Sequence, residues 1–210
     1  MASGTILSRI RDHPMVVKLW SDRLLHVFCG NEIGSAPETD LELRINDMAH
    51  VERFEPTERW HSRDAFIADC RRRVDSSDKM VVTIADRSGP LLGYVFAQVD
   101  ARDSYFPDVE RRLHWPANTA TTFSAYVHPA ARGRRLNRML AVHRNRHLMG
   151  ERGIKWIASA IKGDNRASLQ SNTRAPSKIV ADLSIARRFG HVRKAATRRD
   201  VHPDFVFEIE

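Results

Sequence analysis

The chain has 210 residues, of which 42% are hydrophobic and 29% are charged. This length and balance fit one globular domain with a sizeable core and an additional N-terminal element. No apolar run approaches the roughly 20 residues that a membrane-spanning helix needs, and the N-terminus lacks the pattern of a secretory signal. Cys29 and Cys70 are too few for a disulfide scaffold. We therefore expect a cytoplasmic protein without a membrane span, in which both thiols are ordinary core or surface groups.

Charge is distributed unevenly along the chain. Residues 1–131 hold 16 Lys and Arg against 19 Asp and Glu, a net of −3, whereas residues 132–210 hold 18 against 7, a net of +11. The basic half suits a polyanionic partner, such as a phosphate-bearing cofactor, an acidic carrier protein or a nucleic acid. It is also compatible with a solvated basic face. No helix-turn-helix, zinc finger or aromatic RNA-binding motif is visible, which disfavours a nucleic acid without excluding it.

The predicted elements begin with two stretches of helix-compatible apolar spacing, residues 6–10 and 15–28, separated by Pro14. With the loop over 30–39, they form a predicted helical extension over residues 1–40. The next elements are a strand at 41–45 and helices at 48–54 and 58–73, the second capped by Thr57. Strands at 80–85 and 91–99 follow, joined by a turn at 88–90.

The second half of the chain alternates strands and helices. Residues 100–121 contain two prolines and are predicted to be irregular. The remaining predictions are a strand at 122–127, a helix at 133–152, a strand at 153–160, a helix at 166–174, a hairpin of 178–188 with 192–197, and a last strand at 205–209.

The most informative stretch is Val127-His-Pro-Ala-Ala-Arg-Gly-Arg-Arg-Leu-Asn-Arg-Met-Leu140. A strand, a basic turn and a helix N-terminus in this order can hold a phosphate, because the first helical turn has unpaired N–H groups and a partial positive charge. Gly133 lets the backbone approach a ligand closely. Four arginines of the turn add charge-assisted contacts: Arg132, Arg134, Arg135 and Arg138.

This stretch resembles the coenzyme-binding turn of the GNAT superfamily of acyl-CoA-dependent N-acyltransferases. In that family a strand ending Val-x-Pro is followed by Arg-Gly-x-Gly-x-Gly or Ala and then by a helix. The Val-x-Pro, the first Arg-Gly pair and Leu136 are present, whereas Arg135 and Asn137 replace the second and third glycines. The resemblance implies that the turn holds the pyrophosphate of coenzyme A. It also implies that the preceding strand splays from its neighbour and binds the pantetheine arm and thioester oxygen.

A second block supports the resemblance. Asn165 and Ser168 match an Asn-x-x-Ser element in which the Asn bonds the pantetheine arm, although Asp164 or Asn165 would also serve as a helix N-cap. Pro176 and Ser177 stand where the family usually has Gly-Phe, and no tyrosine follows Met139, so the usual tyrosine acid is absent or supplied from elsewhere. The implied coenzyme-binding residues are Tyr126, Val127, Arg132, Gly133, Arg134, Arg135, Leu136, Asn137, Asn165 and Ser168.

The resemblance covers residues 41–210, and is firm over 122–172. It implies an α/β (α+β) fold with a central mixed, mostly antiparallel sheet flanked by helices, after the helical extension. It also implies acetyl-CoA or another acyl-CoA as donor, no metal, and a small-molecule or peptide amine as acceptor. A homodimer is compatible with this assignment.

The sequence does not identify the catalytic base. Ser124, Tyr126 and His128 lie near the end of the strand, and His114 lies in the irregular segment that often lines the acceptor pocket of related enzymes. A single histidine at such a place is more often a packing or surface residue than a catalytic one. His143 and His147 have the spacing of a metal-binding pair, but no nearby cysteine or carboxylate completes a set.

Several functions remain in competition. The first is N-acyl transfer from coenzyme A, with a variant in which an acidic acyl carrier protein delivers a long acyl chain to the basic face. The second is a non-catalytic binding module on the same fold, which the missing tyrosine and lost glycines favour. The third is nucleic-acid binding by the basic half.

Overall fold

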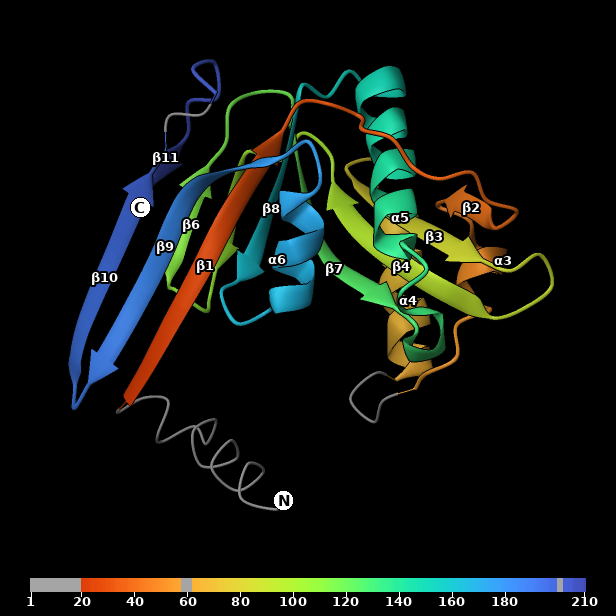
Figure 1. Ribbon diagram of the computed structural model, residues 1–210, viewed down its shortest axis with the longest axis horizontal. Helices are drawn as coiled ribbons and strands as arrows, with labels where there is room; N and C mark the ends of the chain where they lie inside the picture. Colours follow the sequence, from red (N-terminus) through yellow and green to blue (C-terminus); the bar gives the residue numbers. More distant parts are fainter. Residues whose placement is uncertain (1–19, 58–61, 200–201) are drawn as a thin grey trace.

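The computed structural model describes residues 20–57, 62–199 and 202–210, and its main feature is one large sheet (Figure 1). The sheet has eight strands in the order β10-β9-β1-β8-β7-β4-β3-β2. All neighbouring strands pair antiparallel except β7 and β8, which run parallel. The strands are β1 (Trp20–Gly30), β2 (Glu42–Ile45), β3 (Lys79–Ala85), β4 (Leu91–Gln98), β7 (Thr119–Val127), β8 (Trp156–Lys162), β9 (Lys178–Arg188) and β10 (His191–Arg198). This confirms the predicted fold class of a mixed, mostly antiparallel sheet flanked by helices.

The helices cover both faces of the sheet. On the face seen in Figure 1 lie α5 (Leu136–Asn145), which continues as the π-helix η2 (Arg146–Glu151), and α6 (Arg166–Thr173). On the opposite face, α3 (Met48–Val51) and α4 (Arg63–Val74) cover the other side of β3 and β4. We call these the α5 face and the α4 face.

Alternation along the strands explains how both faces are filled. Met80, Val82 and Ile84 of β3 pack with Leu140 of α5, whereas Val81 packs with α3 and α4. Because successive side chains of a strand point to opposite faces, a continuous apolar run supplies both cores.

The N-terminal helix prediction is wrong where it can be compared. Residues 20–28, expected to be helical, belong to β1, which pairs with both β8 and β9. The last four residues of β1 are buried, because neighbouring strands flank them and both faces are covered. Their apolar run therefore has no period of two and reads equally well as a helix. Residues 1–19 lie outside the described residues, and the boundary between residues 40 and 41 stays a prediction.

The predicted N-cap at Thr57 is also wrong. Helix α4 begins at Arg63, and the Ser62 side chain accepts a hydrogen bond from the backbone N–H of Ala65. The Thr57 hydroxyl instead lies 2.8 Å from the hydroxyl of Tyr126. Residues 58–61, the start of the predicted helix, lie outside the described residues.

The segment predicted to be irregular forms a second, small sheet. Its strands are β5 (Asp103–Phe106), β6 (Arg111–His114) and β11 (Glu208–Ile209), in the order β11-β6-β5. The hairpin of β5 and β6 packs against β1, β8 and β9 through a cluster that includes Leu113, Trp115 and Trp156. The apolar pattern did not predict this hairpin, because both strands contain polar residues and Pro107 lies between them.

The loop between β1 and β2 is tied to α5. Arg138 donates hydrogen bonds to the backbone oxygen of Ser35 at 2.6 Å and to its hydroxyl at 3.1 Å. The Asn145 amide donates to the oxygen of Glu32 at 3.2 Å. Arg138, considered above as a phosphate contact, thus has a structural role in holding this loop.

Candidate active site

The parallel strands β7 and β8 separate in the middle of the sheet. Their pairing runs from Thr119 with Trp156 to Thr122 with Ser159 and then stops, although β7 continues for five residues. Beyond that point Phe123, Ser124 and Ala125 are exposed, within a strand that has neighbours on both sides. An exposed stretch in a central strand indicates open space beside the strand, with backbone groups turned toward it.

A β-bulge accompanies this separation. Tyr94 of β4 pairs with Tyr126, but Phe96 pairs with Phe123, so β7 has one residue more than β4 over this interval. Ser124 lies within the bulge and has a positive φ of 51°. A bulge bends and twists its strand, which gives a local cause for the departure of β7 from β8.

The basic turn follows at the end of β7. A 3₁₀ turn, η1 (Pro129–Ala131), leads through Arg132 to Gly133, whose φ is 84°. A methyl group at Gly133 would meet nothing within 4 Å. The positive φ therefore favours glycine here, whereas crowding by the rest of the chain does not require it. The turn is therefore accessible to a ligand.

Helix α5 begins three residues later than predicted, at Leu136. Its N-cap is Arg135, which has a left-handed backbone (φ 60°, ψ 24°) and makes no side-chain capping bond. The N–H groups of Arg138 and Met139 already donate to the Arg135 oxygen, at 3.0 and 3.2 Å. The N–H groups of Leu136 and Asn137 open the helix and are the ones available to an anion.

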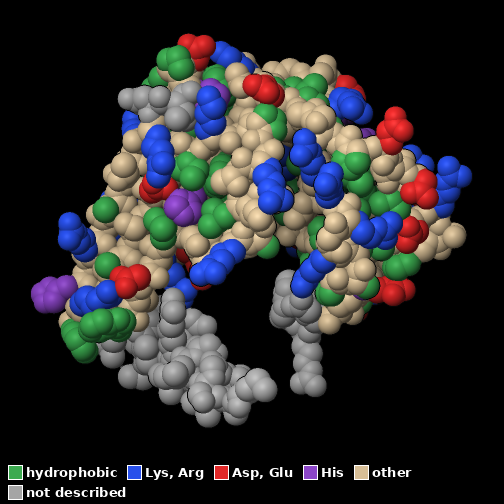
Figure 2. All heavy atoms as spheres, in the orientation of Figure 1, with side chains coloured by type: hydrophobic (Ala, Val, Ile, Leu, Met, Phe, Trp, Pro, Cys, Tyr) green, Lys and Arg blue, Asp and Glu red, His purple; other side chains and the backbone are tan. Residues whose placement is uncertain are grey.

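The side chains of the turn divide between core and surface. Leu136 is buried and packs in the core beneath α5. Arg132, Arg134, Arg135 and Asn137 are exposed. Arg134 lies 4.0 Å from Asp86, a distance at which an exposed pair contributes little. Figure 2 shows Lys and Arg side chains gathered in the middle of the face on which Figure 1 places α5 and α6.

Asn165 caps α6. Its side chain accepts a hydrogen bond from the backbone N–H of Ser168 at 3.2 Å. Asn165 is exposed and Ser168 half-buried, and no residue of α6 is fully buried. The helix thus covers the sheet loosely on the same face as α5, and the coenzyme role of Asn165 and Ser168 stays a prediction.

The four candidate catalytic residues occupy different surroundings. Ser124 lies at the bulge, and His128 accepts a hydrogen bond from the N–H of Ala130 at 3.2 Å and so caps η1. The Tyr126 ring is buried on the α4 face against Tyr94, with its hydroxyl at Thr57. His114 lies on β6, where its Nε2 is 2.8 Å from a carboxylate oxygen of Glu210. Ser124 is thus the one of the four that lies where the strands separate.

A pocket of about 680 Å³ adjoins the separation on the α4 face. Its floor comes from Thr121 and Phe123 of β7 and from Ala158 and Ala160 of β8, that is, from the residues at which the two strands part. Its walls come from the β5–β6 hairpin and from the ends of β3 and β4. Tyr105, Phe106 and Trp115, from the segment expected to line an acceptor pocket, also line this pocket, and the acceptor role of that segment stays a prediction.

Sequence reasoning did not find the pocket's other residues. Asp78 and Asp100 come from loops whose composition carries no distinctive signal, and Phe123 was assigned only as part of a core strand. A hairpin signal was available, since residues 103–106 and 111–114 flank Pro107-Asp-Val-Glu110.

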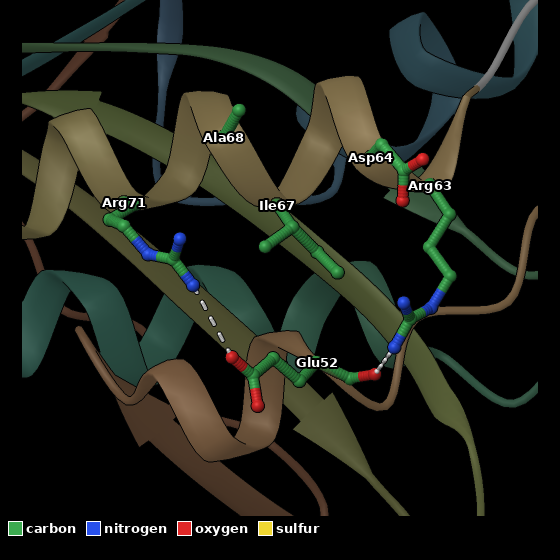
Figure 3. Close-up of a pocket in the computed structure, with 6 residues that line it drawn as sticks. All are labelled: Glu52, Arg63, Asp64, Ile67, Ala68 and Arg71. Carbon is green, nitrogen blue, oxygen red and sulfur yellow. Dashed lines mark hydrogen bonds and ion pairs between the residues drawn. The ribbon is translucent and has the colours of Figure 1, made fainter.

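A second hollow of about 450 Å³ lies between the end of α3 and α4 (Figure 3). Arg71 reaches the Glu52 carboxylate at 3.5 Å, and Arg63 donates to the Glu52 backbone oxygen at 2.6 Å. These contacts connect α4 to the end of α3, and Ile67 lies between the two arginines. The hollow is separate from the opening between β7 and β8 and has no part in the candidate site.

No group of three or more metal-ligating side chains occurs within residues 20–57, 62–199 and 202–210. His147 is instead 2.8 Å from the Glu151 carboxylate, on η2. Among the helices of the described residues, none has the length and apolar character to cross a membrane.

Comparison with known proteins gives a fold. No protein-family model and no curated protein matches the sequence. Among solved structures, a GCN5-related N-acetyltransferase from Sphaerobacter thermophilus is similar over 95% of this chain, with 12% identity and a TM-score of 0.51. A tandem GNAT protein from the clavulanic acid biosynthesis pathway is similar over 93%, with 13% identity and a TM-score of 0.52. A GNAT-family acetyltransferase from Colwellia psychrerythraea is similar over 81%, with 10% identity and a TM-score of 0.52.

The matches span 59%, 58% and 57% of those three longer chains. The chain therefore has the GNAT fold, as its sequence motif predicted. The fold does not by itself fix an activity.

Proposed function

We propose that the protein is an N-acyltransferase that moves an acyl group from acyl-coenzyme A to an amine. The observation that carries this proposal is the separation of β7 from β8 directly before a basic turn and a helix N-terminus. The first feature offers strand backbone with which β8 does not pair, the second would bind an anion, and β7 connects the two. The solved structures of GNAT proteins with a similar fold support the proposal.

The coenzyme would lie on the α5 face. Its pyrophosphate would accept hydrogen bonds from the N–H groups of Leu136 and Asn137 and ion pairs from Arg132, Arg134 and Arg135. The pantetheine arm would follow β7 past Val127 and Tyr126, pairing with backbone groups as a neighbouring strand would. Asn165 and Ser168, at the start of α6, would contact the pantetheine arm on the side opposite β7.

The reaction needs a polarised thioester carbonyl, a neutral attacking amine and a thiolate that can leave. Backbone N–H groups of β7 beyond Thr122 that are directed away from β4 would polarise the carbonyl, because β8 no longer pairs with this part of the strand. Ser124, at the bulge, is the proposed side chain nearest the reacting atoms. Proximity supplies much of such a rate even without a strong base.

The test is ligand-induced stabilisation followed by turnover. Wild-type protein is heated with coenzyme A and with acetyl-, octanoyl- and palmitoyl-CoA, and a ligand at 100 times its Kd stabilises by about 2.7 kcal/mol. We expect a shift in melting temperature that Arg132→Ala reduces. The acyl-length trend then identifies the donor.

The matched control is Arg146→Ala, an exposed arginine where α5 passes into η2. This variant should keep the full shift. No shift with any thioester would contradict the proposal and favour a carrier-protein donor. A shift without release of coenzyme A from acetyl-CoA across a panel of amines would favour the non-catalytic binding module.

A further inference from the structure

The pocket on the α4 face is larger than the transferred group requires. A volume of about 680 Å³ lies within the range of small-molecule sites, roughly 300 to 1,000 Å³. It opens at the separation of β7 and β8, opposite the face on which the coenzyme is proposed to lie. The space is therefore available either to an acceptor or to a long acyl chain, and its lining distinguishes the two.

The walls are partly aromatic. Phe123 and Tyr105 are large side chains with 37% and 53% of their surface exposed, and both line the pocket. The Trp115 indole is fixed by its Nε1, which donates to the Ser104 hydroxyl at 2.9 Å. The Arg73 guanidinium lies 5.0 Å from the Phe123 ring centroid and that of Arg112 lies 5.7 Å from the Tyr105 centroid, so another ring can stack only on the remaining face of each.

The rim is charged. Asp78, Asp100 and Asp103 face Arg102 and Arg112, leaving an excess of one negative charge. Asp100 is 3.2 Å from Arg102, and Asp103 pairs with Arg112. Asp78 forms no ion pair with a Lys or Arg of the described residues, and its carboxylate accepts a hydrogen bond from the Ser76 hydroxyl.

This lining does not suit a long alkyl chain. An alkyl chain would cover aspartate and arginine side chains without giving them hydrogen-bond partners, which costs free energy. A cation near the exposed Asp78 carboxylate would gain a modest attractive interaction. The lining therefore favours a polar, positively charged occupant with a flat apolar part.

Resting on the proposed function, we propose that this pocket binds the acceptor, and that the acceptor is an amine carrying an aromatic ring and a second cationic group. The ring lies between Tyr105 and Phe123, and the second cation lies at Asp78. The reacting amine then points through the floor toward Ser124 and the thioester. Its nitrogen forms the amide bond as the carbon–sulfur bond breaks, and coenzyme A leaves as the thiol with a proton from the amine.

Four amines separate the two requirements: p-xylylenediamine has both a ring and a second charge, benzylamine only the ring, 1,6-diaminohexane only the charge, and 4-(aminomethyl)benzoate the opposite charge. Their binding to the coenzyme A complex is measured by calorimetry, and their acetylation by the release of coenzyme A. We expect p-xylylenediamine to bind most tightly and the benzoate most weakly, with a difference of about tenfold or more.

The variants assign each requirement to a residue. Asp78→Asn should remove the preference for p-xylylenediamine over benzylamine, a loss of about fivefold, and leave the KM for acetyl-CoA unchanged. Tyr105→Ala should weaken the binding of p-xylylenediamine and benzylamine and spare 1,6-diaminohexane. Asp75→Asn, three residues away and outside the pocket, and Phe189→Ala, a ring that is 73% exposed elsewhere, are the matched controls.

Two results would overturn the inference and leave the coenzyme site intact: none of the four amines binds the coenzyme A complex, or Asp78→Asn and Tyr105→Ala behave like their controls. A loss of palmitoyl-CoA affinity in Tyr105→Ala would instead assign the pocket to the acyl chain. Failure of the proposed function is recognised separately, because coenzyme A itself would not stabilise the protein.

Discussion

Two residues of the basic turn have left-handed backbones, Gly133 and Arg135. This conformation costs a residue with a side chain roughly 1 kcal/mol relative to glycine. Arg135→Gly should therefore raise the free energy of unfolding by about 1 kcal/mol, and Gly133→Ala should lower it by a similar amount, measured by urea denaturation. Arg134→Gly, at a neighbouring position without positive φ, should not stabilise. If Arg135→Gly stabilises the protein but weakens coenzyme binding, the Arg135 side chain contributes to binding at the cost of a strained backbone.

His50 gives stability a pH dependence. Its Nδ1 is 2.6 Å from the Thr83 hydroxyl, and burial lowers its pKa below the ordinary value. The unfolded chain then binds more protons than the folded one, so stability falls as pH drops through the ordinary histidine range, about pH 7 to 5.5. His50→Gln should flatten this decline in urea titrations at several pH values. The exposed His191→Gln should reproduce the wild-type slope, and an unchanged slope in His50→Gln would contradict the assignment.

At the scale of elements, the sequence predicts well those that carry a local signal. The hairpin of β9 and β10 was predicted because Phe189-Gly190 separates two strand-like runs, and α6 was predicted from the Asn165 and Ser168 block of the family resemblance. The strand β1 was not, since its burial depends on two neighbours distant in sequence, β8 and β9. The separation of β7 from β8 is a relation between strands, and only the family resemblance suggested it. The pocket was missed because its residues come from five separate segments.

The two cysteines, in β1 and α4, are buried by the packing of these elements. Cys29 and Cys70 have no exposed surface, and burial raises the pKa of Cys70 to about 12 and that of Cys29 further. Thiolates, not thiols, react with disulfide reagents, so both cysteines should react with DTNB at least about tenfold more slowly in native protein than in denaturant. Fast labelling of either thiol in the native protein would contradict this burial. The same reagent can therefore report released coenzyme A with little background.

At the scale of the whole molecule, the uneven charge predicts a dependence on salt. Residues 132–210, which begin at the proposed phosphate turn, carry the net charge of +11. Raising NaCl from about 50 to about 500 mM should weaken coenzyme A binding by about tenfold, because screening and counterions compete with the arginines. Acetyl-pantetheine, which lacks the phosphates, should bind with little dependence on salt. Equal sensitivity of both ligands in calorimetry would argue against a phosphate site at this turn.

The point where β7 and β8 stop pairing borders the pocket on the α4 face, and the proposed coenzyme site lies on the α5 face. A donor held by α5 and α6 and an acceptor held against the β5–β6 hairpin would approach this point from opposite sides, so neither needs to leave before the other arrives. Both substrates can then occupy the protein together, and no acylated form of the protein is required. Initial rates measured at several fixed acceptor concentrations should give double-reciprocal plots that intersect, whereas parallel lines would indicate that a side chain carries the acyl group between two half-reactions.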